Sequence, residues 1–335
     1  MGLDANATTC LLYARTLGVS FARTAMLGRQ RLVAPAGALR ENLAAFGYSL
    51  GTDAIDGLLK RGGGYAEPFL EQLGATEICS LDASDWEHAS DISDLNSPIG
   101  ERFQNRFTAV LDGGTLEHVF NFPVAIANCM DMIQVGGHFL AITPTNNFMG
   151  HGFYQFSPEL FFRVFSASNG FQVVRMIVFE NRPRPEWFEV ADPAAVNERV
   201  GVVNSRPTNL FVIAKKVAAV RALTTPPHQS GYVAAWESVR TNPASRVPAW
   251  DSLQRTRDPA AAGPNASHGT HTEPTFSSRL KRKLFRLAPA RVQRMYVRFR
   301  NPQYRDYPYD PRFFRRIEIP PVATPQSRVL PESPD

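Results

Sequence analysis

Two histidines and a neighbouring glutamate offer the side chains best suited to proton transfer. His118 directly follows Glu117, and His151 lies between two glycines. Because imidazole titrates near neutral pH, either histidine could remove a proton from a hydroxyl group. His151 is the favoured base because its glycine neighbours predict an open turn. His118 has capping or packing as its alternative role, and Glu117 is expected to orient its turn rather than accept a proton.

These residues belong to a segment, Phe107 to Pro144, that predicts a strand, a turn, a helix and a second strand. Phe107 to Leu111 is an apolar run broken only by a threonine, as in strands buried on both faces of a parallel sheet. Asp112 ends this strand, and the glycines after it permit a tight turn. The apolar face of the helix consists of Phe122, Val124, Ile126, Cys129, Met130 and Ile133.

Two glycines, Gly136 and Gly137, are expected to stop this helix, and Phe139 to Ile142 is the second buried strand. Two apolar strands joined by a helix predict a right-handed crossover in a mostly parallel sheet. Ligands of such sheets bind beyond the carboxyl ends of the strands. The polar residues after both strands should therefore face one crevice: Asp112, Thr115, Glu117 and His118 after the first, and residues 143–147 after the second.

The stretch LDGGTLEHVFNFPVAIANCMDMIQVGGHFLAITP resembles the second half of a class I S-adenosylmethionine-dependent methyltransferase. The resemblance rests on two motifs, the LEHV turn after the fourth strand and the Gly-Gly turn before the fifth strand. The resemblance implies an α/β, Rossmann-like fold with a seven-stranded, mostly parallel sheet and helices on both faces. It also implies that Phe171 to Phe179 and Asn209 to Lys215 close the sheet as an antiparallel hairpin, and that S-adenosyl-L-methionine is the cofactor.

The resemblance assigns cofactor contacts to the ends of the early strands. Gly28 ends a predicted strand, Thr24 to Leu27, but the family's acidic residue and G-x-G-x-G loop are replaced by LGRQ. Asp82, after the strand EICSL, would bind the ribose hydroxyls, and Asp94 the adenine amino group; the alternative for this acid-rich segment is a solvated loop with Asx turns. The other expected cofactor contacts are Asp112, Gly113, Gly114 and Glu117.

The loop after the fifth strand, NNFMGHGFYQFSP, is expected to bind the acceptor of the methyl group. Amide side chains bond hydroxyls, and aromatic rings pack on the C–H faces of sugars. The candidates are Asn146, Asn147, Phe153 and Tyr154. The alternative is a loop folded on its own aromatic side chains, with both asparagines bonded to the turn backbone.

The composition also bears on where the protein is located and on whether it has disulfides or a metal site. No apolar run approaches the roughly 20 residues needed to cross a bilayer, and the N-terminus lacks the early basic segment of a secretory signal. Cys10, Cys79 and Cys129 stand singly, which argues against disulfides and against a zinc site, and no metal is expected. A cytoplasmic location, with peripheral membrane association as the alternative, is expected; the oligomeric state stays open.

The net charge of +5 is concentrated near the C-terminus, where the segment Arg279 to Arg300 has nine Lys or Arg and no acidic residue, so the remainder is net acidic. We expect a methyltransferase-like domain (1–217), a largely disordered linker rich in Pro, Ala and Ser (218–275) and a basic tail with short amphipathic helices (276–335). Such helices lie on anionic membranes or acidic proteins; a solvated tail is the alternative. No module for specific nucleic-acid recognition accompanies the charge.

Two functions from different classes follow. The first is a methyltransferase that transfers a methyl group to a hydroxyl of a small molecule or glycan with the help of a histidine. The second is an inactive, methyltransferase-like binding or scaffold protein of a surface-glycan locus, because the first glycine loop is degenerate. A NAD-dependent oxidoreductase is disfavoured, since no G-x-G-x-x-G follows a predicted strand.

Overall fold

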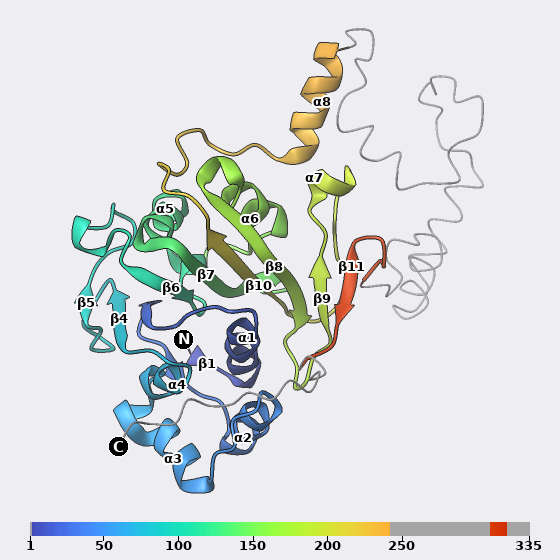
Figure 1. Ribbon diagram of the computed structural model, residues 1–335. Coiled ribbons are helices and arrows are strands. Elements are labelled where there is room, and N and C mark those ends of the chain that lie inside the picture. Colours follow the sequence, from blue (N-terminus) through green and yellow to red (C-terminus); the bar gives the residue numbers. More distant parts are fainter. Residues whose placement is uncertain (1, 242–308, 320–335) are drawn as a thin grey trace, which may run out of the picture. The chain divides into compact units, whose positions relative to one another are not determined.

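The computed structural model describes residues 2–241 and 309–319 (Figure 1). Its main sheet has the strand order β11-β9-β8-β10-β7-β6-β2-β4-β5. The parallel half consists of β2 (Arg23–Leu27), β4 (Glu77–Asp82), β5 (Asp91–Ile92), β6 (Phe107–Asp112) and β7 (Ile133–Asn146). The antiparallel half consists of β8 (Phe171–Glu180), β9 (Trp187–Val190), β10 (Thr208–Lys216) and β11 (Phe314–Ile317).

The predicted Rossmann-like fold class is confirmed, and so is the antiparallel closure of the sheet. Strand β10 lies between β7 and β8 and is antiparallel to both. Within residues 2–241 and 309–319, the sheet has nine strands rather than the seven expected. The additional strands, β9 and β11, have four residues each. They pair with each other across more than 120 residues of sequence, and local pattern carries no signal for such a pairing.

Helices cover both faces of the sheet. On one face, sheet residues such as Met26, Leu111 and Leu140 form a hydrophobic cluster with apolar residues from the first four helices. These helices are α1 (Ala5–Thr16), α2 (Ala36–Ala45), α3 (Thr52–Lys60) and α4 (Glu67–Gln72). On the opposite face, Phe139 packs against Phe161 in α6 (Pro158–Val164) and against Phe165. Helix α5 (Phe122–Met132) joins β6 to β7, as predicted.

The N-terminal helix, α1, has no counterpart in the sequence prediction. Its start is fixed by Asp4, whose side chain accepts a hydrogen bond from the backbone N–H of Ala7 (2.8 Å). Two-residue strands β1 (Gly2–Leu3) and β3 (Arg31–Leu32) pair in parallel and tie this end of the chain to the segment after β2. The tie contributes to holding residues 28–35 beside the sheet.

The prediction that Gly136 and Gly137 stop helix α5 was wrong, since β7 begins at Ile133 and runs through both glycines. The free carbonyls at the end of α5 are bonded instead by a lysine from a distant strand. Lys216, only 4% exposed, donates from Nζ to the carbonyls of Met130 (2.9 Å) and Ile133 (2.8 Å). Gly137 has a different role, because a Cβ there would lie 2.9 Å from the carbonyl oxygen of Phe107 on β6.

The chain divides into two compact units, one of residues 1–192, 206–227 and 314–335, and one of residues 193–205 and 228–313. The described part of the second unit includes α7 (Pro193–Val196) and α8 (Ser230–Thr241). Helix α8 lies within the segment 218–275, for which a largely disordered linker was expected. Most of the predicted linker and basic tail, including Arg279 to Arg300, lies outside the described residues. Among residues 2–241 and 309–319, no helix is long and apolar enough to cross a membrane.

Candidate functional site

The carboxyl ends of β2, β4 and β6 lie side by side, and they bring three of the predicted cofactor residues together. Leu27 is in register with Leu81 and with Asp112. Gly28 follows with a φ of +66°, in the left-handed region that favours glycine. A Cβ at Gly28 would lie 3.1 Å from Thr115 Oγ1 and 3.9 Å from Asp82 Oδ2. The Asp82 carboxylate is therefore directed toward the turn after β2.

Asp112 organises the turn that follows β6. It is fully buried, and its Oδ1 accepts hydrogen bonds from the backbone N–H groups of Thr115 (2.7 Å) and Leu116 (3.3 Å). Its Oδ2 has no hydrogen-bond partner within the described part of the chain. Burial, and then the neighbouring Glu117, raise the pKa of Asp112 above the ordinary aspartate range. The predicted contact of Asp112 with a cofactor stays a prediction.

A buried glutamine that the sequence analysis did not single out lies between two of these turns. Gln30 is 1% exposed and donates from Nε2 to the carbonyl of Leu27 (2.7 Å). Its Oε1 is buried and has no partner among residues 2–241 and 309–319. A Cβ at Gly113 would lie 2.8 Å from both Cδ and Oε1 of Gln30. The glutamine amide thus packs directly on the backbone of Gly113, and the LGRQ departure from the glycine loop was the signal in the sequence.

Asp94 follows the short strand β5 at the same edge of the sheet. Ser93, just before it, donates its backbone N–H to the carbonyl of Asp82 (2.7 Å). The side chain of Asp94 is exposed and accepts hydrogen bonds from the backbone (2.9 Å) and side chain (2.8 Å) of Asn96. These two bonds lower the pKa of Asp94. The Asx turn named as the alternative is present, and a contact with adenine stays a prediction.

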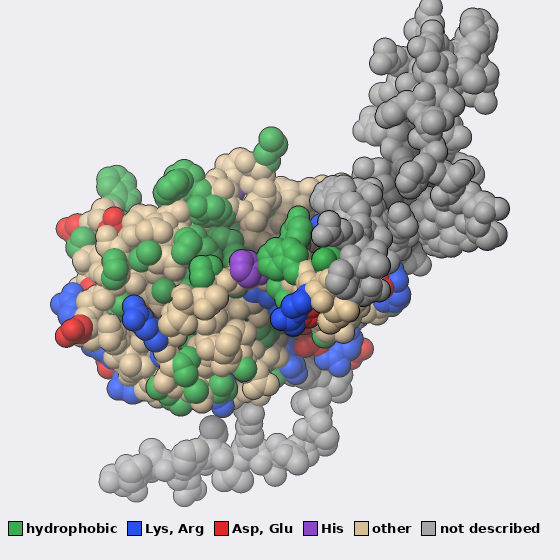
Figure 2. All heavy atoms as spheres, turned by 90° about the horizontal axis from the view of Figure 1, so that it is seen from above, with side chains coloured by type: hydrophobic (Ala, Val, Ile, Leu, Met, Phe, Trp, Pro, Cys, Tyr) green, Lys and Arg blue, Asp and Glu red, His purple; other side chains and the backbone are tan. Residues whose placement is uncertain are grey.

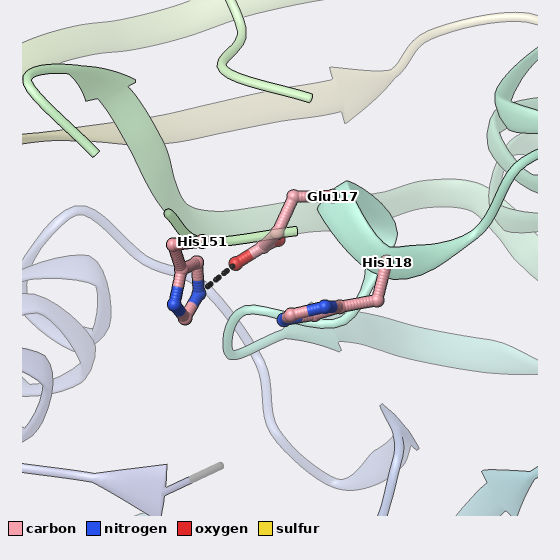
Figure 3. A group of neighbouring side chains, drawn as sticks. All are labelled: Glu117, His118 and His151. Atoms are coloured by element: carbon pink, nitrogen blue, oxygen red, sulfur yellow. Dashed lines mark ion pairs between the residues drawn. The ribbon is translucent and has the colours of Figure 1, made fainter. Parts of the chain in front are cut away.

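Glu117, His118 and His151 form one cluster (Figure 3). Glu117 and His118 belong to the 3₁₀ turn η3 (Leu116–His118), and Glu117 is 1% exposed. Its Oε1 lies 3.4 Å from His151 Nε2, and its Oε2 accepts a hydrogen bond from Thr143 Oγ1 (3.2 Å). The rings of His118 and His151 meet edge to face, with centroids 4.9 Å apart. Burial raises the pKa of Glu117, while burial and then His151 lower that of His118.

The position of His151 is set by the loop around it. The backbone N–H groups of Phe153 and Tyr154 donate to the carbonyl of Glu117 at 2.7 and 3.2 Å. Gly152 has a φ of +67°, and a Cβ there would lie 2.8 Å from that same carbonyl. Glycine is required where the loop crosses η3. These main-chain bonds therefore hold His151 beside the Glu117 carboxylate. The sequence alone did not predict this contact, because 33 residues separate Glu117 from His151.

The four residues predicted to bind an acceptor lie near this cluster but differ in their contacts. Asn146 ends β7, while Asn147 donates from Nδ2 to the carbonyl of Arg206 (2.8 Å). Tyr154 donates its hydroxyl to the carbonyl of Phe120 (2.7 Å). Phe153 is 67% exposed and meets the exposed ring of Phe120 edge to face. Asn147 thus bonds the backbone of a distant segment rather than that of its own turn, as the alternative had it, and Tyr154 also bonds main chain. Phe153 presents an apolar face.

The surface seen from above the sheet has hydrophobic side chains gathered around a histidine (Figure 2). Phe120, Met149 and Phe153 are exposed large apolar residues of the loops around η3. Exposed apolar side chains close to polar, titratable groups are typical of ligand-binding surfaces. The cluster therefore combines a buried carboxylate, two accessible imidazoles and an apolar rim.

No family model matches the chain, and no curated protein matches it. Among solved structures, the chain is similar to 1,6-didemethyltoxoflavin-N1-methyltransferase from Burkholderia thailandensis, with 14% identity and a TM-score of 0.36 over 64% of this chain and 78% of that one. A SAM-dependent methyltransferase from Archaeoglobus fulgidus gives 10% identity and a TM-score of 0.33 over 63% and 94%.

The C9 mutein of the branched-chain polyamine synthase from Thermus thermophilus gives 12% identity and a TM-score of 0.31 over 67% of this chain and 58% of that one. These likenesses are too distant to bear on function. The fold assignment rests on the strand order and pairing described above.

Proposed function

We propose that this protein is an S-adenosylmethionine-dependent methyltransferase that methylates a hydroxyl group of a small molecule or glycan. The observation that carries the proposal is the meeting of Gly28, Asp82 and Thr115 at the carboxyl edge of the sheet. Glu117 follows β6 and its partner His151 follows β7, at the carboxyl edge of the sheet where ligands of such sheets bind. Gly28, Asp82 and Thr115 would bind the nucleoside of the cofactor, and the Glu117–His151 pair would remove a proton from the acceptor.

The side chains present fit the cofactor. Asp82 Oδ2 would accept hydrogen bonds from the ribose hydroxyls, and Asp94 would meet the adenine amino group. Gln30 Oε1, a buried acceptor with no donor within the described residues, would accept from the amino group of the cofactor. Bound S-adenosylmethionine supplies the electrophilic methyl group. The left-handed backbone at Gly28 and Gly114 shapes the turns that would meet the cofactor. The other expected contacts are Gly113, Asp112 and Glu117.

The chemistry assigned to the chain is positioning and proton removal. His151 would accept the proton of the acceptor hydroxyl, because its Nε2 is held near Glu117 Oε1 and its ring is 44% exposed. His118, whose ring lies against His151, is the second candidate for this base. Phe153 would pack on the acceptor, and Asn146, Asn147 and Tyr154 would define its loop. Alignment of the hydroxyl with the methyl group provides the remainder of the catalysis.

Calorimetric titration of the whole chain with S-adenosylhomocysteine tests the cofactor half of the proposal. We expect binding at micromolar concentrations and a loss of at least 10-fold in Asp82→Ala, with Asp56→Ala as the matched control on the exposed face of α3. Methylation of a panel of sugars and phenols tests the other half, with His151→Ala expected to lose most turnover. An absence of binding would refute the proposal.

A second candidate, an inactive binding or scaffold protein, is favoured by one observation. The side chain of Gln30 occupies the space over Gly113. In that case the wild-type chain would not bind S-adenosylhomocysteine, and no acceptor would be methylated. Its partners would be sought through the basic segment Arg279 to Arg300, for which we propose an anionic membrane surface or an acidic protein.

A further inference from the structure

Three potential metal ligands converge at the Glu117 cluster, although no ligand motif is visible in the sequence. One ligating atom from each of Glu117, His118 and His151 lies within 4.8 Å of the other two (Figure 3). We propose that these three side chains bind a divalent transition-metal ion of the zinc or manganese type. Two imidazoles with one carboxylate suit such ions better than Mg²⁺ or Ca²⁺, which prefer oxygen ligands throughout.

The geometry is close to that of a bound site. Zinc binds histidine nitrogen and carboxylate oxygen at about 2.0–2.2 Å, which puts tetrahedral ligands about 3.3–3.5 Å apart. Glu117 Oε1 and His151 Nε2 are 3.4 Å apart. His118 is exposed, so its ring can rotate to close the remaining distance. Metal binding therefore requires one side-chain movement and no change in the backbone.

The electrostatics favour a cation at this place. The carboxylate of Glu117 is buried, and in the described part of the chain it forms no ion pair with a lysine or arginine. A buried carboxylate without a cationic partner is costly. A divalent cation bound at Glu117 Oε1 would compensate this carboxylate.

Two further contacts hold the ligands in place before any ion binds. Thr143 Oγ1 donates to Glu117 Oε2, which leaves Oε1 directed at His151. The backbone bonds from Phe153 and Tyr154 to the carbonyl of Glu117 keep the loop of His151 against η3. Hydrogen bonds that orient metal ligands commonly change affinity 10- to 100-fold. The cluster thus has ligands and an outer layer of orienting contacts.

The consequence for catalysis rests on the proposed function. Three protein ligands leave a coordination position open, as catalytic zinc sites do. The hydroxyl oxygen of the acceptor would take that position, where the cation lowers the pKa of the hydroxyl and its proton leaves to water. In the metal-bound protein His151 is a ligand, and it is a proton acceptor only in the metal-free protein.

The test is calorimetric titration of the untagged, chelator-treated full chain with Zn²⁺, Mn²⁺ and Mg²⁺. We expect one strong Zn²⁺ or Mn²⁺ site, weak or no Mg²⁺ binding, and a loss of at least 100-fold in Glu117→Gln and in His151→Ala. His88→Ala is the matched control, since His88 is an exposed histidine 3.8 Å from Asp85. Unchanged stoichiometry and affinity in both ligand variants would refute the site, as would an absence of binding to the wild type.

A second variant, Thr143→Ala, tests the metal site independently if Glu117→Gln does not fold. Thr143→Ala keeps all three ligands and removes only the bond to Glu117 Oε2, so we expect a loss of roughly 10-fold in metal affinity. Metal should raise the melting temperature of the wild type and of His88→Ala, but not that of His151→Ala. These readouts need no S-adenosylmethionine. Failure of metal binding is therefore separate from failure of the methyltransferase proposal, which S-adenosylhomocysteine titration of the chelated protein tests.

Discussion

Replacement of Gln30 by alanine gives the sharpest test of how the chain compensates for its missing glycine loop. The substitution removes the buried Oε1 that has no hydrogen-bond partner among the described residues, and the Nε2 bond to Leu27. A hydrogen bond between an amide oxygen and a cationic amine contributes roughly 1.5–3 kcal/mol. If Oε1 accepts from the amino group of the cofactor, Gln30→Ala should weaken binding of S-adenosylhomocysteine roughly 10- to 150-fold.

The assay is calorimetric titration of wild type and Gln30→Ala with S-adenosylhomocysteine and with adenosine, which lacks the amino acid portion. The loss should appear with S-adenosylhomocysteine and be nearly absent with adenosine. Gln104→Ala is the matched control, since Gln104 is an exposed glutamine after the turn η2 (Glu101–Phe103). Melting temperatures of the three proteins separate a local loss of contacts from a general loss of structure.

The opposite result would refute the reasoning. If Gln30 only fills the space over Gly113, its removal should tighten binding or create binding that the wild type lacks. Equal losses for adenosine and S-adenosylhomocysteine would show that Gln30 supports the turn without meeting the amino group. An unchanged affinity for both ligands would show that Gln30 does not face the cofactor.

Three further predictions concern Asp82, His138 and Lys216. Asp82→Asn should weaken adenosine binding about 10-fold, measured by calorimetry, because a neutral amide replaces a charged acceptor; an equal affinity would contradict the ribose role. Burial lowers the pKa of His138 from 6.5 to about 4, so the unfolded chain binds more protons between these values and stability falls as the pH falls through them. His138→Leu should remove up to about 3 kcal/mol of this acid sensitivity in urea unfolding, and parallel pH profiles would contradict it. Lys216→Met should cost roughly 1–3 kcal/mol for each carbonyl left unbonded, and an unchanged unfolding midpoint would show that these bonds contribute little.

The part of the fold that depends on local pattern was predictable. Strand β6 and helix α5 lie close to their expected bounds, because apolar periodicity marks both. Strand β7 (Ile133–Asn146) begins six residues before and ends four residues after the expected Phe139 to Ile142. The end of α5 was not predictable from local pattern, since Lys216 bonds the carbonyls there from a strand more than 80 residues later. The short edge strands β9 and β11 share this nonlocal origin.

In the candidate site, too, contacts between strand ends were predictable from the sequence, and contacts made by loops were not. Asp82 and Gly28 could be placed together because each ends a recognisable strand of one parallel sheet. The pairing of Glu117 with His151 could not, because it depends on main-chain bonds of a loop that has no repeating pattern. The role of Gln30 was not predicted because it depends on contact with Gly113, which lies 83 residues later in the turn after β6.

The pairing of β11 with β9 has a consequence for how this protein is made. Phe314 to Ile317 forms the outermost strand of the sheet and is aligned with Val190 to Trp187. During synthesis, the sheet therefore cannot be completed until residue 317 has left the ribosome. Until then, the backbone of β9 offers an unpaired edge on which a second nascent chain could add. A shortened version ending at residue 217 would keep that edge permanently, so soluble production should require residues 314–317.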